Sequence, residues 1–336
     1  MMEQISKLKV SIDKNMSIDK NISRDNNTSM NKKLAEDRAL SDDKKKKIKY
    51  INEQSMNQKL AMYLRNPSAL LLLVCVLLAA IITIGVLGLL VGYILIKGIP
   101  YLSLDLFAWQ YTSDNVSMMP AIINTLIMTV IALVIAAPLG MGAAIYLVEY
   151  AKKDNKLVGI VRITAETLSG IPSIIYGLFG MLFFVASLKW GYSILAGACT
   201  VAIMVLPVIM RTTEEALLAV PDSYREGSFG LGAGRLRTVF KIILPAAVPG
   251  ILSGIILAVG RIVGETAALM YTAGTVADAS SNLMASGRTL AVHMYSLSRE
   301  GLHVNEAYAT AVVLLIVVMG INGFSGFLAK KISKSK

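Results

Sequence analysis

Charged side chains inside an apolar segment are the residues of this sequence that could do chemistry. Arg261 and Glu265 stand four positions apart in the apolar run 246–270, so on one helix they would share a face, about 6 Å apart along its axis. A lone cation at mid-depth in a membrane costs at least about 2.5 kcal/mol, and pairing lowers that cost. If the helix begins near Pro245, Arg261 lies about 24 Å along it, too deep to reach water at that end. Arg261 is therefore expected to face protein or water.

Two roles are open for this pair. The two residues can form an ion pair that only fixes helix packing, helped by close approach at Gly260 and Gly264. Alternatively, Arg261 offers a planar donor fork to an anion in a translocation path, while Glu265 orients it and keeps the empty pore near neutral. A tetrahedral oxyanion suits such a fork. Glu166 has a packing or capping role and a pathway role as equal alternatives.

Other kinds of reactive site are not indicated. Cys75 and Cys199 fall inside apolar runs without a metal-ligand spacing, and His293 and His303 read as ordinary loop residues. The glycine-rich stretch 230–234 follows no strand pattern, and the phosphate-binding pattern G-x-x-x-x-G-K-[ST] is absent. We predict no catalytic residue, metal or cofactor in this chain, so any ATP hydrolysis belongs to a partner.

The composition predicts an all-α integral membrane protein. Hydrophobic residues make up 55% of the 336 residues, and the mean hydropathy is +0.61. Apolar runs cover residues 69–96, 120–148, 168–188, 191–210, 246–270 and 307–329. Each is long enough to cross a hydrocarbon core of about 30 Å as a helix of about 20 residues. We therefore expect about six transmembrane helices.

Loop charges predict the orientation of these spans. Lys and Arg crowd the N-terminal segment, the second and fourth connections and the C-terminal end, so these parts, with both termini, should be cytoplasmic. The net charge of +11 is then explained by this bias and by attraction to anionic membrane lipid, and nucleic-acid binding is a poor alternative. We predict a multi-pass protein of the cell (plasma or inner) membrane.

One polar loop resembles a known motif. The triplet Glu226-Gly227-Ser228 is followed by Gly232 and by an Ile-x-Leu-Pro end at Pro245. This spacing resembles the EAA loop of ABC-transporter permeases, in which Glu-Ala-Ala is followed by a fixed Gly and the same end. The second and third residues of the triplet are small, as in the motif, but they are Gly227 and Ser228 instead of two alanines.

Three further segments make the sequence similar to the phosphate ABC-transporter permease of the PstA type. They read LSGIPSIIYG at 168–177, GRIVGET at 260–266 and TLAVHMY at 289–295. The resemblance covers roughly residues 65–330. It implies the type I (MetI-like) importer permease fold and three kinds of protein partner: a second homologous permease, a dimer of ATP-binding subunits and an extracytoplasmic phosphate-binding protein.

The resemblance also implies roles for individual residues and a division of the chain. Arg261 and Glu265 would line the substrate path, and Glu166 is kept beside them as a candidate path residue on the residue argument given above. A short helix with Arg225 and Glu226 exposed would seat the loop on the ATPase; the implied coupling residues are Arg225, Glu226, Gly227, Ser228, Gly232 and Pro245. We predict a disordered cytoplasmic tail at 1–65, whose SIDKN repeat and charge argue against folding. The first transmembrane helix and extracytoplasmic loop follow at 66–115, a permease core at 116–330 with a coupling loop at 211–245, and a short cytoplasmic tail at 331–336.

Alternatives from two classes remain. The chain can be the partner permease (PstC type) of the same complex or a permease for another oxyanion. A secondary transporter driven by an ion gradient predicts internal symmetry and acidic sites for coupling ions, whereas here an EAA-like loop stands in place of such sites.

Overall fold

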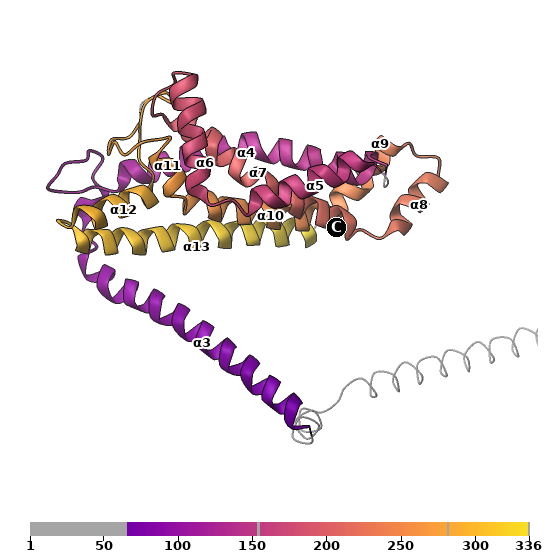
Figure 1. Cartoon of the computed structure of the whole chain (residues 1–336), viewed down its shortest axis with the longest axis horizontal. Helices are drawn as coiled ribbons and strands as arrows, with labels where there is room; N and C mark the ends of the chain where they lie inside the picture. The colour runs from indigo at the N-terminus through magenta and orange to yellow at the C-terminus, as the bar shows by residue number, and fades with distance from the viewer. Residues whose placement is uncertain (1–65, 153–154, 281, 335–336) are drawn as a thin grey trace, which may run out of the picture. The chain divides into compact units, whose positions relative to one another are not determined.

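A computed structural model of the protein describes residues 66–152, 155–280 and 282–334 (Figure 1). The predicted tail at 1–65 lies outside them. The chain divides into two compact units, residues 1–87 and 88–336, which are described separately. Every regular element within the described ranges is a helix, which confirms the all-α prediction.

The first unit contains the N-terminal part of helix α3 (Pro67–Gly98). Leucine, isoleucine, valine and alanine fill this part without a charged residue, and almost all of its large side chains are exposed. An apolar helix exposed on all sides requires lipid or other apolar helices around it. The first predicted span is thereby confirmed.

The second unit holds the remaining helices. In chain order they are η1 (Ile99–Tyr101), η2 (Leu104–Phe107), α4 (Met119–Ile145), η3 (Tyr146–Tyr150), α5 (Lys156–Ser169), α6 (Ser173–Gly180), η4 (Met181–Ser187), α7 (Ile194–Leu218), α8 (Asp222–Gly230), α9 (Arg235–Thr238), η5 (Val239–Ile243), α10 (Leu244–Val263), α11 (Ala267–Met270), α12 (Leu290–Glu300) and α13 (Val304–Lys334).

Among the described residues, five helical runs are long and apolar enough to cross a membrane, and there are six if one bent pair is counted as a single span. The pair is α5 with α6 and η4, whose axes differ by 100°. The third predicted span, 168–188, is therefore broken rather than one helix. Pro172 explains the break, because a proline disfavours helical backbone at the residue before it, and its own ψ is extended at 139°. Figure 1 shows α5 running along the bundle and α6 turned away from it.

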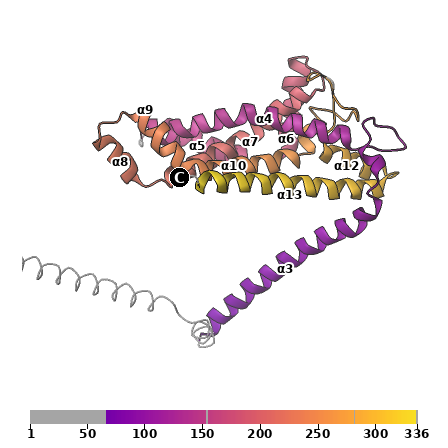
Figure 2. The same cartoon turned by 180° about the vertical axis from the view of Figure 1, so that it is seen from behind.

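Helix α7 forms the centre of the second unit. It packs against α4, α10, α5 and α6, and α4, α7, α10 and α13 run side by side in both views (Figures 1 and 2). Small residues allow these close approaches: Ala132 and Ala136 of α4 and Ala198 and Ala202 of α7 are fully buried in one cluster. In lipid there is no hydrophobic driving force between helices. Small side chains let the helices come close enough for van der Waals packing to hold them together.

Helices α7 and α10 approach each other closely at Gly254. A Cβ atom added at Gly254 would lie 2.7 Å from Cβ of Thr212, well inside contact distance. By contrast, Gly142 in α4 is exposed, and a Cβ there would meet nothing within 4 Å. The two glycines thus differ in surroundings but not in helical backbone.

We expect Gly254→Ala to destabilise the permease by about 1–3 kcal/mol through overpacking. Gly142→Ala is the matched control and should stabilise it by up to about 1 kcal/mol, since alanine favours helix. Thermal unfolding of the purified protein in detergent measures both. Equal shifts in the two variants would contradict the close α7–α10 contact.

The connection between α11 and α12 caps the start of α7. Backbone N–H groups of Ser193, Ile194 and Leu195 donate to carbonyls of this connection at 3.0, 3.0 and 2.9 Å. Buried Asn124 of α4 ties the same connection down: its amide donates to the carbonyls of Asp278 (3.1 Å) and Arg288 (3.2 Å). First-turn N–H groups of a helix need such partners, so the connection is fixed to the bundle.

Candidate functional site

The predicted coupling loop contains a short helix, α8, as expected. Asp222 in its first turn suits the positive end of the helix dipole. At its end, the Gly232 N–H donates to the Phe229 carbonyl (2.9 Å) and the Ala233 N–H to the Ser228 carbonyl (3.1 Å). This bonding requires a left-handed residue, and Gly232 has φ of +78°. Gly232 therefore stops the helix and turns the chain.

Arg225 was predicted to be exposed, and this prediction is wrong. Its side chain is only 16% exposed and lies 2.7 Å from the Glu149 carboxylate, itself 7% exposed. It also donates to the backbone carbonyls of Leu217 and Val220, both at 2.9 Å. Arg225 thus ties α8 to the ends of η3 and α7. The sequence gives no local signal for this pair, since the partners are 76 residues apart.

The other predicted coupling residues divide into an exposed and a buried group. Glu226 and Gly227 face outward on α8. Ser228 is buried, and its hydroxyl lies 2.8 Å from that of Thr238 in α9. Pro245 stands in the first turn of α10, within a helical run that extends without interruption from Arg235 to Val263. Through Ser228, α8 is therefore joined to the start of that run.

Arg261 and Glu265 do not lie on one helix, contrary to the prediction. Helix α10 ends at Val263, and Gly264 follows as its C-cap. Glu265 is buried, and its carboxylate accepts the backbone N–H of Ala268 at 3.0 Å, at the start of α11. A carboxylate that captures a nearby N–H competes with helix continuation, which explains the break. Within the described ranges no ion pair joins Arg261 to a carboxylate, so the packing ion pair is not found.

The first resembling segment packs against the short helix that directly follows the second one. Helix α6 packs against α11, and a Cβ at Gly177 would lie 2.8 Å from Cα of Ala268. The Tyr176 hydroxyl donates to the Leu168 carbonyl at 2.8 Å across the α5–α6 bend. Arg261, a half-buried residue in the last turn of α10, thus lies a few residues before the α10–α11 break, which packs against α6.

Glu166 belongs to a different cluster. Its exposed carboxylate lies 3.6 Å from Arg211, which is also 3.3 Å from Glu215; Arg162 and Glu214 pair beside them. These residues line a pocket of about 310 Å³ between α5 and α7. The sequence reasoning placed Arg211 in a connection, but α7 extends to Leu218 and includes it. The spacing of four positions between Arg211 and Glu215 was the available signal.

The third resembling segment contains a buried cluster that the sequence reasoning missed. His293 was expected to be an ordinary loop residue, but it is 0% exposed in α12. The Arg288 guanidinium lies 4.6 Å above the ring of Tyr111, and the His293 ring meets the same ring edge-on at 6.3 Å. Burial and then the charge of Arg288 lower the pKa of His293 to about 3, although the Val116 carbonyl acts in the opposite direction. His293 is therefore neutral in the folded protein.

This pKa makes folding sensitive to acid. Below the ordinary histidine value of 6.5 the unfolded chain gains a proton that the folded chain excludes until about pH 3, so stability falls as pH falls through that window. We expect roughly 2 kcal/mol of lost stability between about pH 7.5 and 5.

His293→Gln should remove most of this acid sensitivity, whereas His303→Gln, at a partly exposed position, should leave it. Denaturant unfolding across the pH range measures both. An unchanged pH profile in His293→Gln would show that another group titrates.

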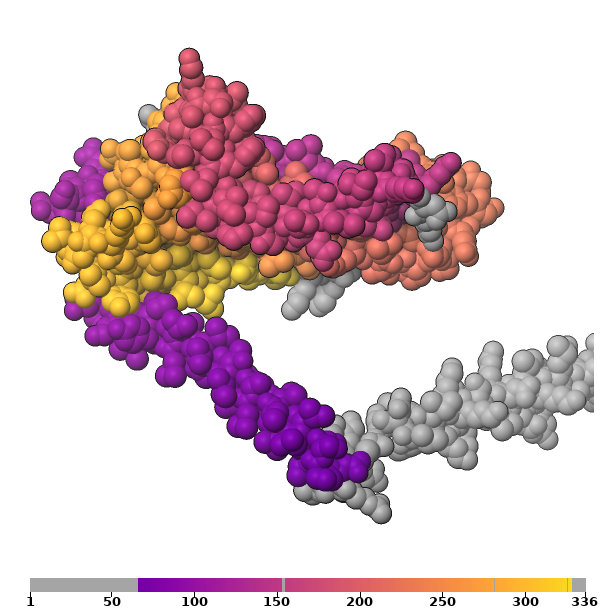
Figure 3. All heavy atoms as spheres, in the orientation of Figure 1, coloured from indigo at the N-terminus to yellow at the C-terminus, as the bar shows by residue number. Residues whose placement is uncertain are grey.

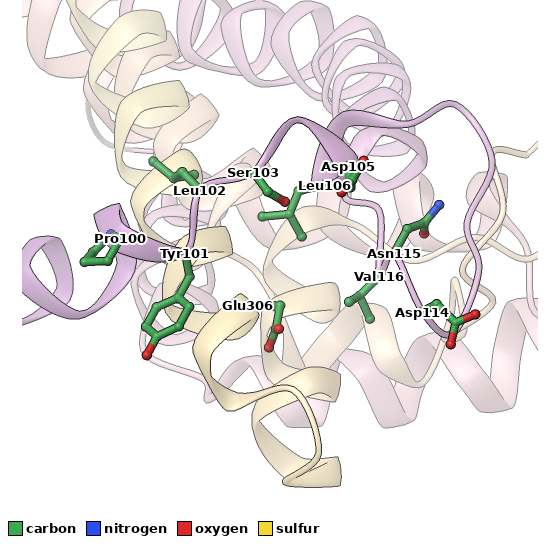
Figure 4. A pocket seen from close by; sticks show the side chains of 10 residues that line it. All are labelled: Pro100, Tyr101, Leu102, Ser103, Asp105, Leu106, Asp114, Asn115, Val116 and Glu306. Carbon is green, nitrogen blue, oxygen red and sulfur yellow. The ribbon is translucent and has the colours of Figure 1, made fainter.

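A pocket at the same end of the unit is acidic (Figure 4). It has a volume of about 470 Å³, and its charged lining residues are Asp105, Asp114 and Glu306. Three carboxylates without a cation in the lining disfavour an anion. No group of three or more His, Cys, Asp or Glu side chains in the described residues is placed to hold a metal ion.

Long apolar helices around α7, with a short polar helix held at one end by Arg225, define a membrane-embedded transport component. Residues 136–334 match the family described as "Binding-protein-dependent transport system inner membrane component", and the chain belongs to this family. It is a multi-pass membrane protein and a permease component, which confirms the resemblance drawn from the loop.

Individual relatives agree with this assignment. The chain is 35% identical over 282 residues to the probable ABC transporter permease protein YqgI of Bacillus subtilis, covering 77% of this chain and 93% of the relative. It is 32% identical over 273 residues to the phosphate transport system permease protein PstA of Haemophilus influenzae, covering 80% and 96%. PstA 1 of Mycobacterium tuberculosis is 36% identical over 206 residues, covering 60% and 67%.

Solved structures confirm the predicted fold. A chain of a bacterial ABC transporter that imports alginate has a TM-score of 0.59 at 17% identity, covering 82% of this chain and 99% of that one. A chain of the inward-facing MetNI methionine ABC transporter has a TM-score of 0.51 at 21% identity, covering 64% and 94%. At these identities the similarity shows the type I permease fold alone.

Proposed function

We propose that this chain is the membrane-spanning permease subunit of an ATP-driven importer of inorganic phosphate and forms half of its pore. The observation that carries the proposal is Arg261, a half-buried arginine in the last turn of the membrane helix α10, with no carboxylate paired to it in the described residues. A planar guanidinium free of a counterion suits a tetrahedral oxyanion. Relatives named as phosphate permeases support phosphate over other oxyanions.

The rest of the transporter follows from the family. We infer a second homologous permease, a dimer of ATP-binding subunits that hydrolyses ATP, and an extracytoplasmic phosphate-binding protein, with both termini of this chain cytoplasmic. The exposed side chains of Tyr224 and Phe229 on α8, with Leu231 at its C-cap, give an apolar surface for the ATPase. A secondary transporter is set aside because the family depends on a binding protein.

The structure offers a mechanical route from α8 to Arg261. Arg225 and Ser228 fix α8 to the ends of α7 and η3 and to α9. From Arg235 the helical run continues to Val263, and at about 1.5 Å per residue it carries a displacement over about 39 Å to Arg261. A rigid element of this kind can transmit closure of the ATPase to the pore. Glu265 and Glu166 remain proposed path residues.

The overall test is ATPase activity of the reconstituted transporter. Adding the phosphate-loaded binding protein should stimulate hydrolysis and drive uptake of radioactive phosphate. Competition by sulfate, phosphonate and molybdate distinguishes phosphate from related oxyanions. Uptake of one of these in preference to phosphate would contradict the substrate assignment.

Arg261→Lys keeps the charge but loses the planar fork, so phosphate uptake should fall at least about tenfold. The complex should still insert and assemble. Arg299→Lys, on the exposed side of α12, is the control and should transport normally. Wild-type uptake by Arg261→Lys would return Arg261 to a packing role.

Valine substitutions at two glycines test the coupling role of the loop. Gly232 and Gly234 both have open space around them, but Gly232 has φ of +78° and Gly234 has φ of −72°. Valine at 232 is strained by about 1–3 kcal/mol, whereas valine at 234 is not. Gly232→Val should therefore weaken copurification of the ATPase or uncouple hydrolysis from uptake. Normal coupling in Gly232→Val, or equal loss in Gly234→Val, would be evidence against a role for this turn.

A further inference from the structure

Three neighbouring polar side chains at the start of α12 are buried without hydrogen-bond partners. Arg288 is 4% exposed, Thr289 2% and His293 0%. In the described residues no partner is present for Nε and Nη2 of Arg288 or Oγ1 of Thr289, and neither ring nitrogen of His293 has a hydrogen bond of normal geometry, although the Val116 carbonyl lies near the ring. Buried polar atoms are bonded in the great majority of cases, so a cluster of exceptions requires an explanation.

The surrounding backbone is firmly held, so loose local structure does not explain the cluster. The Arg288 N–H donates to the Val276 carbonyl at 2.9 Å, and the Arg288 carbonyl accepts from Asn124 at 3.2 Å. The Leu290 N–H donates to the buried Thr125 hydroxyl at 2.8 Å. The unbonded side chains are therefore held in place by their own main chain.

Tyr111 covers the cluster but gives its unbonded polar atoms no hydrogen-bond partner. Its ring lies 4.6 Å from the Arg288 guanidinium carbon and 6.3 Å from the His293 ring centre, so the cation and the imidazole flank one phenol. A desolvated cation–π contact returns about 2 kcal/mol, less than the several kcal/mol that burial of an unpaired ion costs. No carboxylate in the described residues lies within 4 Å of Arg288.

The chemistry of the cluster favours an oxyanion. Guanidinium, hydroxyl and imidazole all can donate hydrogen bonds. They stand at the N-terminus of an 11-residue helix whose N-cap, Thr289, makes no side-chain cap bond. Helix N-termini and arginine both favour negative charge.

We propose that Arg288, Thr289 and His293 form an oxyanion site at the start of α12, closed by Tyr111, at which the transported anion is held before it reaches Arg261. This proposal rests on the proposed function. The space-filling view places α12 and α8 at opposite ends of the second unit (Figure 3), as do the ribbon views. The site therefore lies at the end away from the coupling helix, where substrate arrives.

The carboxylates of the nearby acidic pocket do not prevent an anion from binding at this site. None of Arg288, Thr289 and His293 lines it, and Asp105 and Asp114 are exposed. Charges in water are screened over about 8 Å at physiological salt, whereas a desolvated guanidinium is screened much less. At the nitrogen atoms of Arg288 the field of the buried cation dominates.

The first experiment titrates the reconstituted permease and ATPase complex in nanodiscs with inorganic phosphate, without ATP or binding protein. Arg261→Gln is the background, so that binding at Arg261 is removed. We expect phosphate to bind this variant, and Arg288→Gln added to it should weaken binding at least about tenfold. Arg299→Gln removes the same charge from an exposed position of α12 and should change binding less than about twofold.

A second measurement covers the case in which Arg288→Gln does not assemble. The chain has 2 histidines, so ¹⁵N-histidine labelling of the otherwise wild-type chain gives two sets of signals, assigned with His303→Gln. Phosphate or sulfate should shift the His293 signals and leave those of His303. Arg288→Lys should reduce the response.

Unmoved His293 signals, or phosphate binding unaffected by Arg288→Gln, would overturn the site. Failure of the proposed function looks different: the wild-type transporter would not take up phosphate, while the His293 signals would still respond to an oxyanion.

Discussion

The contact of Arg225 with Glu149 is the constraint on which the coupling end of the permease depends. Helix α8 has one buried side chain, Ser228, so apolar packing cannot hold it. Its position comes from the guanidinium, which bonds to a carboxylate of η3 and to carbonyls of the α7 end. Removing one partner of such a buried pair costs about 3–5 kcal/mol, because the other is left unpaired. The same contact that orients α8 therefore makes it move with the bundle.

Broken helices define the other end of the mechanical route. Pro172 interrupts α5–α6, and Gly264 with Glu265 interrupts α10–α11, and the two interruptions come together where α6 packs on α11. Broken helices within a membrane leave backbone polar groups that protein or water must satisfy. Tyr176 and Glu265 each satisfy one such group. Arg261, in the last turn of α10, precedes this junction by a few residues and is half-buried.

The sequence predicted the features that depend on local residue patterns. It missed the side-chain contacts between residues that are distant in the chain. Hydropathy identified the apolar spans but not the break at Pro172 in the third, and the spacing from Glu226 to Pro245 identified the loop with its short helix. The shared face of Arg261 and Glu265 was wrong because a four-residue spacing assumes a continuous helix, and α10 ends between them. The enclosure of Arg225 and His293 had no local signal, since Glu149 and Tyr111 lie far away in the chain.

The arginines of the bundle fall into two groups, those that form an ion pair with a carboxylate and those that do not. Arg162, Arg211 and Arg225 each pair with a glutamate and join one helix to another. Arg261 and Arg288 have no such partner in the described residues, although both are at least half-buried. An unpaired guanidinium away from water is costly in structure alone, and an anion that passes and leaves is a counterion that does not have to be part of the chain. The arginines paired with glutamate thus hold helices together, and Arg261 and Arg288, the two buried or half-buried ones without such a partner in the described residues, are those proposed to meet the substrate.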